Sequence, residues 1–70
     1  MHEQLREILS AKPFIPFTVV MSDGTHITVT HPDMAWLTKL FLYVTTDDGE
    51  TVRHLYLLHV TQILRQEQAV

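Results

Sequence analysis

Histidine is the residue type in this chain with the widest chemistry, because a neutral imidazole can bind a metal ion or act as a general base. Four of the five histidines form two equally spaced pairs, His26 with His31 and His54 with His59. In a strand this odd spacing directs the two side chains to opposite faces, and it also misses the i, i+4 spacing of a helical zinc site. The chain has no cysteine, so we expect no metal and no cofactor and interpret the histidines as structural or surface residues. A site assembled from separate strands or across a subunit interface is the alternative.

His31 and Asp33 are the two residues whose types suit acid–base catalysis, with a carboxylate that would orient an imidazole. Pro32 between them is typical of the first position of a short helical turn, where Asp33 would accept backbone amides and favour the local dipole. Ser10 and Ser22 fall at an expected helix end and in a turn, with no neighbouring base to activate them. We therefore predict no catalytic residue and no enzyme, and an enzyme built on His31 and Asp33 is the least favoured alternative.

Aromatic residues are the strongest candidates for a binding surface. Phe41 and Tyr43 share an expected strand face with Lys39, a combination that can stack nucleic-acid bases beside a cation. Aromatic side chains also dominate protein cores and interfaces, and the formal charge of −3 disfavours RNA. We therefore favour a core or oligomer contact, with nucleic-acid binding as the alternative. The predicted interface residues are Trp36, Phe41, Tyr43 and Tyr56, and the residues of the RNA alternative are Lys39, Arg53, His31 and Asp33.

Three carboxylates gather in the short segment of Asp47, Asp48, Gly49 and Glu50, and such oxygens could hold a divalent cation. The segment is much shorter than an EF-hand loop, and acidic residues are common at hairpin tips. We interpret it as a solvated turn between two strands.

A helix is the first element that the hydrophobic pattern predicts. Leu5, Ile8 and Leu9 follow the i, i+3, i+4 spacing of one apolar helical face, over residues 2–11. Pro13 disfavours helical geometry at residue 12, so the helix should end at residue 11. An isolated helix this short is unstable in water and must pack against the rest of the chain.

A β-hairpin follows, because apolar and polar residues alternate over residues 17–31 around an Asp-Gly turn. A three-residue loop over residues 22–24, with Gly24 left-handed, places the large apolar residues on one face. A tight two-residue turn would mix the two faces, which a half-buried hairpin avoids. The expected register pairs Phe17 with Val29 and Val19 with Ile27.

A second hairpin is predicted after a single turn or bend at Pro32. Strand structure should resume at Leu37 or Leu40, and residues 40–46 and 51–58 form the two strands. Both strands are apolar at almost every position, so the pattern leaves their register open.

A closing strand over residues 61–65, after a one-turn bend at residues 58–60, completes the expected fold, with a helix there as the alternative. Residues 66–70 are expected to be a frayed tail. The sequence thus predicts one small domain over residues 1–70. Its fold class is mainly β with one N-terminal helix, and residues 16–65 form a small, strongly bent antiparallel sheet or open barrel of about five strands.

Self-association is the expected source of additional stability. A chain of 70 residues buries only a little over ~60% of its unfolded surface, and disulfides are unavailable without cysteine. The composition is 46% hydrophobic and 19% charged, which indicates that apolar surface meets a partner chain. We expect a homo-oligomer and allow for a further protein partner.

The N-terminal segment contains acidic residues and no apolar run that could direct secretion or cross a bilayer. We therefore expect a cytoplasmic protein with no membrane partner.

Several short motifs resemble a group of small uncharacterised bacterial proteins, namely Pro13-Phe-Ile-Pro-Phe17, Val19-x-Met-x-Asp23-Gly24, Val29-x-His31-Pro32-Asp33 and Leu58-His-Val-Thr-Gln-Ile63. The order of helix, bent strands, short turn and last strand is also similar to Sm-like and other SH3-like small barrels. The Sm resemblance implies a ring that is closed by strand-edge pairing and binds single-stranded RNA. It further implies an Asp and an Asn after the second strand and an Arg-Gly pair near the end.

Asp33 can take the Asp position of the Sm pattern, whereas Ala35 stands at the Asn position and no Arg-Gly pair follows Leu58. A shared fold does not by itself supply a shared function. We therefore predict a non-enzymatic, self-associating protein-interaction or scaffold module, with an Sm-like single-stranded RNA-binding module as the alternative.

Overall fold

A computed structural model describes residues 2–45 and 50–65 of the chain. Six short strands and one α-helix make up most of it, so the fold is mainly β with one N-terminal helix, as the sequence predicts. In chain order the elements are α1 (His2–Ser10), β1 (Phe17–Met21), β2 (His26–Val29), η1 (Pro32–Met34), β3 (Ala35–Leu37), β4 (Phe41–Thr45), β5 (Val52–Tyr56), η2 (Leu57–His59) and β6 (Val60–Arg65).

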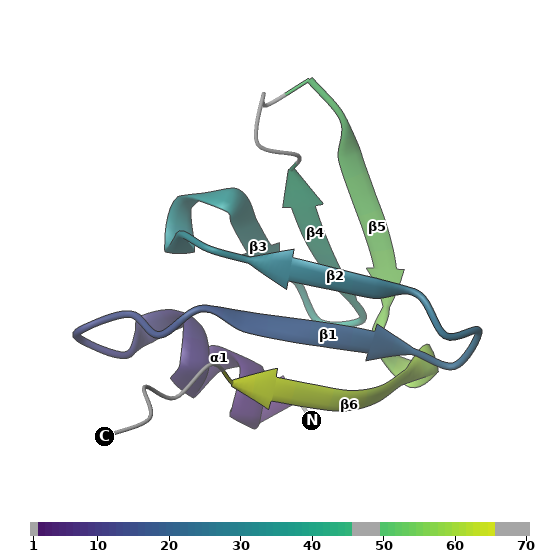
Figure 1. Ribbon diagram of the computed structural model, residues 1–70, viewed down its shortest axis with the longest axis horizontal. Helices are drawn as coiled ribbons and strands as arrows, with labels where there is room; N and C mark the ends of the chain where they lie inside the picture. The colour runs from purple at the N-terminus through teal and green to yellow at the C-terminus, as the bar shows by residue number, and fades with distance from the viewer. Residues whose placement is uncertain (1, 46–49, 66–70) are drawn as a thin grey trace.

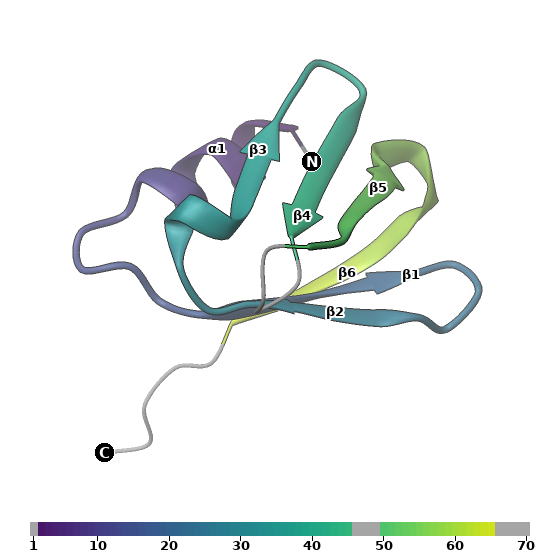
Figure 2. The same cartoon turned by 90° about the horizontal axis from the view of Figure 1, so that it is seen from above.

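The strands form two antiparallel three-stranded sheets, with orders β2-β1-β6 and β3-β4-β5. Figure 1 shows β4 and β5 crossing the direction of the first sheet, and Figure 2 shows α1 beside β3, away from the β1–β2 turn. The described strands do not close into a barrel, which agrees with the open form expected. There are six strands rather than about five because Ala35–Leu37 forms a separate short strand, β3, that pairs with β4.

The first hairpin has the register that the sequence predicts. Phe17 pairs with Val29 and Val19 with Ile27. The loop is closed by a hydrogen bond of 2.9 Å from the Gly24 amide to the Met21 carbonyl, and Gly24 has a φ of 90°. A left-handed residue at this position is what the three-residue bulged turn requires.

The second half of the chain departs from the predicted boundaries in several places. Strand structure resumes already at Ala35, earlier than Leu37 or Leu40, because Ala35 pairs with Val44. The strand β5 stops at Tyr56, where η2 forms the predicted bend, and β6 is the closing strand rather than a helix. The helix α1 ends at residue 10, one residue before its expected end.

Two predictions fall on residues outside the described part of the chain. These are the tip of the second hairpin, residues 46–49, and the tail, residues 66–70.

The core lies between the two sheets and is closed at one end by α1. Leu5 and Ile8 of the helix have 0% and 5% of their surface exposed, and this packing holds a helix too short to persist alone. Among the described residues no buried side chain is polar or charged. The helix and all six strands contribute to the core, which consists of Leu5, Ile8, Phe17, Val19, Ile27, Val29, Ala35, Leu42, Val44, Leu55 and Val60.

Candidate functional site

The outer side of the β3-β4-β5 sheet is the candidate site. In β4, Leu42 and Val44 are buried against the core, so alternation directs Phe41 and Tyr43 to the outer side. Pairing between strands then places the outward residues of the three strands side by side. Trp36 and His54 both lie opposite Tyr43, and Tyr56 lies opposite Phe41. We name this surface the aromatic face, formed by Trp36, Phe41, Tyr43, His54 and Tyr56.

Most of the rings in the aromatic face touch one another. The ring centroids of Phe41 lie 6.0 Å from Tyr43 and 5.2 Å from Tyr56, and the centroids of Tyr43 and His54 are 4.9 Å apart in an edge-on arrangement. The Tyr56 ring also meets His59 of η2, at 5.3 Å. Rings that already support one another lose little side-chain freedom when a partner covers them, which favours binding.

The aromatic face also contains no Asp, Glu, Lys or Arg. Trp36 is 54% exposed and Val52 is 48% exposed. The one charged residue of the three strands is Arg53, and alternation places it on the other side of the sheet, opposite the buried Val44. None of the outward positions is Asp, Glu, Lys or Arg; they are Trp36, Phe41, Tyr43, Thr45, Val52, His54 and Tyr56.

Two exposed leucines lie at the Phe41 end of this sheet. Leu40, in the β3–β4 turn, is 53% exposed, and Leu58, in η2, is 77% exposed. The two segments adjoin, because the Leu57 amide donates a hydrogen bond of 2.9 Å to the Leu40 carbonyl. Exposed apolar side chains are therefore also present just beyond this end of the strands.

The structure brings all four predicted interface residues onto one sheet face, whereas the four residues of the RNA alternative are dispersed. Lys39 was predicted to share a strand face with Phe41 and Tyr43. This prediction is wrong, because Lys39 lies in the β3–β4 turn, outside β4. It lines a hollow beside α1. Arg53 instead lines a hollow of about 240 Å³ with Asp23 at the β1–β2 turn.

His31 and Asp33 lie two residues apart at the start of η1, and no hydrogen bond joins their side chains. Pro32 stands at the first position of this short helical turn and Asp33 lies in its first turn, as predicted. Within the part of the chain that the structure describes, however, the Asp33 carboxylate accepts no backbone amide. The η1 turn is closed instead by the Met34 amide, which donates to the His31 carbonyl at 3.1 Å.

Residues 2–45 and 50–65 contain no group of three His, Asp or Glu side chains that could hold a metal ion. Of the acidic segment expected at the second hairpin tip, Asp47, Asp48 and Gly49 lie outside these ranges. No helix within them is long and apolar enough to cross a membrane.

The sequence did not identify His54 as part of the face, nor Leu40 and Leu58 as its extension. The position of His54 depends on its pairing with Tyr43, and that register could not be read from strands that are apolar on both sides. The exposure of the two leucines depends on where β4 begins and β5 ends.

Comparisons with known proteins leave the chain without an assigned family, since no family model, curated protein or solved structure matches it.

Proposed function

We propose that this protein is a non-enzymatic interaction module that associates with a second copy of itself through the aromatic face. The observation that carries the proposal is a three-stranded face with five rings, no Asp, Glu, Lys or Arg, and a Trp36 side chain 54% exposed. Contiguous exposed apolar surface of this kind marks interaction sites, and aromatic residues are enriched at the centres of interfaces.

A second copy suits this face better than an unrelated partner does. Two identical faces meeting about a two-fold axis bring no Asp, Glu, Lys or Arg side chains of like charge together, since the outward positions contain none of these residues. The strand β5 also has one neighbour, β4, among the described strands, so its other edge is open beside the face. Coverage by another copy would protect this edge from uncontrolled pairing.

The size of the face indicates how far the interface must extend. The strands β4 and β5 have five residues each and β3 has three. At about 3.4 Å per residue and about 4.8 Å between strands, they cover roughly 210 Å² in plan. A standard interface buries about 800 Å² on each partner. The strands alone are therefore too small, and the proposed interface includes Leu40 and Leu58 at the end of the sheet.

Light scattering coupled to size exclusion tests the proposal. The wild type is compared with Trp36→Lys, and with Leu64→Lys as a matched control, because Leu64 is 47% exposed on β6 of the other sheet. We expect a dimer or other small oligomer for the wild type and the control, unchanged between about 50 and about 500 mM salt, and a folded monomer for Trp36→Lys. Circular dichroism of each variant shows whether it is folded.

Two kinds of result would overturn the proposal. One is a wild-type monomer at the highest concentrations, or a Trp36→Lys variant that remains assembled. The other is a particle that carries nucleic acid, seen in the ratio of absorbance at 260 and 280 nm and removed by salt, because phosphate contacts weaken steeply as salt rises. That second result would favour the single-stranded RNA alternative.

A further inference from the structure

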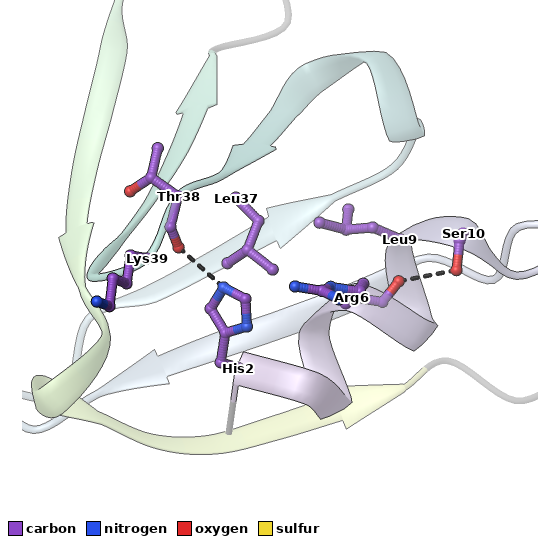
Figure 3. Close-up of a pocket in the computed structure, with 7 residues that line it drawn as sticks. All are labelled: His2, Arg6, Leu9, Ser10, Leu37, Thr38 and Lys39. Atoms are coloured by element: carbon purple, nitrogen blue, oxygen red, sulfur yellow. Dashed lines mark hydrogen bonds between the residues drawn. The ribbon is translucent and has the colours of Figure 1, made fainter.

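A hollow of about 550 Å³ lies between α1 and the turn that joins β3 to β4. Figure 3 shows side chains from both segments around it, with His2 and Arg6 projecting from the helix and Leu37 and Lys39 coming from the other side. Its volume falls within the range of about 300–1,000 Å³ that is common for ligand-binding pockets, but the hollow is open to solvent and would cover only one side of a small molecule.

The hollow is basic although the chain as a whole is acidic. Among the described residues, Arg6, Lys39 and His2 line it and no Asp or Glu does, in a chain with eight acidic residues and five Lys and Arg. Within the same residues Arg6 has one carboxylate neighbour, Glu3, at 3.7 Å, and both side chains are largely exposed. An exposed pair at this distance is weak and leaves most of the guanidinium donors available.

Two fixed cations flank the His2 ring. The ring is held in place because Nε2 donates a hydrogen bond of 3.1 Å to the Thr38 carbonyl, which can only accept. In the neutral ring that donates from Nε2 the other nitrogen, Nδ1, is an acceptor, so His2 adds no second donor for an anion. The Arg6 guanidinium points across the hollow toward this ring, while Lys39 lies on the far side of His2 (Figure 3).

The remaining lining is apolar or already hydrogen-bonded. Leu9 and Leu37 are half-buried and pack against the core, so they give the hollow a fixed apolar side. The hydroxyls of Ser10 and Thr38 donate to the backbone carbonyls of Arg6 and Phe41, at 2.8 and 3.1 Å. The donors that remain for a ligand are therefore the charged ones.

We infer that this hollow binds a small organic anion, with its carboxylate or phosphate oxygens on the Arg6 guanidinium and its apolar body against Leu9 and Leu37. A planar guanidinium matches both kinds of anionic head through paired hydrogen bonds. Lys39 adds long-range attraction without a fixed contact. The inference does not depend on self-association, because the hollow adjoins the helix and not the outer side of the sheet.

The test is a titration of the full chain, followed by amide chemical shifts in nuclear magnetic resonance spectra. The probes are benzoate, phenyl phosphate and benzamide, the last being a neutral molecule of nearly the same size as benzoate. We expect saturable shifts at Leu37, Thr38 and the α1 amides with at least one of the anions. Benzamide should bind at least about tenfold more weakly, since it lacks the charge that strengthens such hydrogen bonds.

Two variants locate the binding. Arg6→Gln should weaken the anion at least about tenfold. Arg65→Gln makes the same change in net charge but lies at a different hollow on the other flank of α1, with Gln4 and Glu7, and should change affinity by less than about twofold. Thermal melts show whether either variant loses its fold.

The inference fails if neither anion gives saturable shifts in the wild type, or if benzamide binds as tightly as both anions. It also fails if a folded Arg6→Gln variant binds the anion as the wild type does, or if Arg65→Gln weakens binding as much as Arg6→Gln. Comparison of benzoate with phenyl phosphate then identifies the preferred head group.

Discussion

Truncation of Trp36 to alanine gives the most quantitative expectation for the aromatic face. The side chain is 54% exposed, and a tryptophan presents up to about 250 Å², so roughly 135 Å² is available to a partner. At about 25 cal/mol per Å² its full burial corresponds to about 3.4 kcal/mol, and imperfect burial and ordering reduce this to about half. A two-fold dimer contains two such residues, so Trp36→Ala should raise the dimer Kd by roughly 300-fold.

Sedimentation equilibrium over a concentration series measures this Kd, and urea unfolding measures the stability of the same proteins. Trp36 points away from the core, so its removal should lower the free energy of unfolding of the monomer by only about 1 kcal/mol. Leu64→Ala is the control, since Leu64 is 47% exposed on the other sheet, and it should leave the Kd nearly unchanged. A shift of less than about tenfold for Trp36→Ala, or an equal shift for the control, would refute the reasoning.

Three further predictions concern the fold. Leu42 is fully buried, so Leu42→Ala should lower the free energy of unfolding by about 2–5 kcal/mol in urea titrations, and a loss below about 1 kcal/mol would contradict the assigned core. Gly24 has a φ of 90° with no atom within 4 Å of an added Cβ, so Gly24→Ala should cost about 1–2 kcal/mol from backbone conformation alone, and an unchanged melting temperature would contradict the bulged turn. Hydrogen bonds from the Thr25 side chain and then its backbone amide hold the pKa of Asp23 below its usual value. The stabilisation from this carboxylate is therefore present above its usual pKa and is lost as the pH falls through the lower pKa of the folded state. Asp23→Asn should accordingly flatten the decline in melting temperature below about pH 4. An identical decline in the wild type and the variant would show that Asp23 contributes nothing.

The first hairpin was predictable because two independent signals agree. Alternation requires Val19 and Ile27 to share a face, and a glycine stands at the position of the loop that needs a left-handed backbone. The bend before the last strand was also expected, but the spacing left open whether a strand or a helix follows it, and the structure has the strand β6.

The second hairpin shows where such reasoning stops. Its strands carry apolar side chains on both sides, Leu42 and Val44 toward the core and Phe41 and Tyr43 outward. Without a contrast between the sides, period-two alternation cannot fix which residues pair. The aromatic residues were therefore identifiable as a class, whereas the contact between Tyr43 and His54 requires the folded register.

The basic hollow lies beyond sequence reasoning for a different reason. His2 and Thr38 are in contact although 36 positions separate them. Only the docking of α1 against β3 brings Arg6 near Lys39, and no local spacing encodes that arrangement.

The strand β1 pairs with one strand that is close to it along the sequence and with another that is far from it, and this affects the order of folding. Val19 pairs with Ile27 across a short loop and with Ile63 near the far end of the described chain. Closing a long loop costs more conformational entropy than closing a hairpin, so contacts with distant partners tend to form late and to set the folding rate. The local hairpins are thus expected to nucleate, and the docking of β6 to complete the molecule. Until β6 docks, the second side of β1 is an unoccupied template for a strand of another chain.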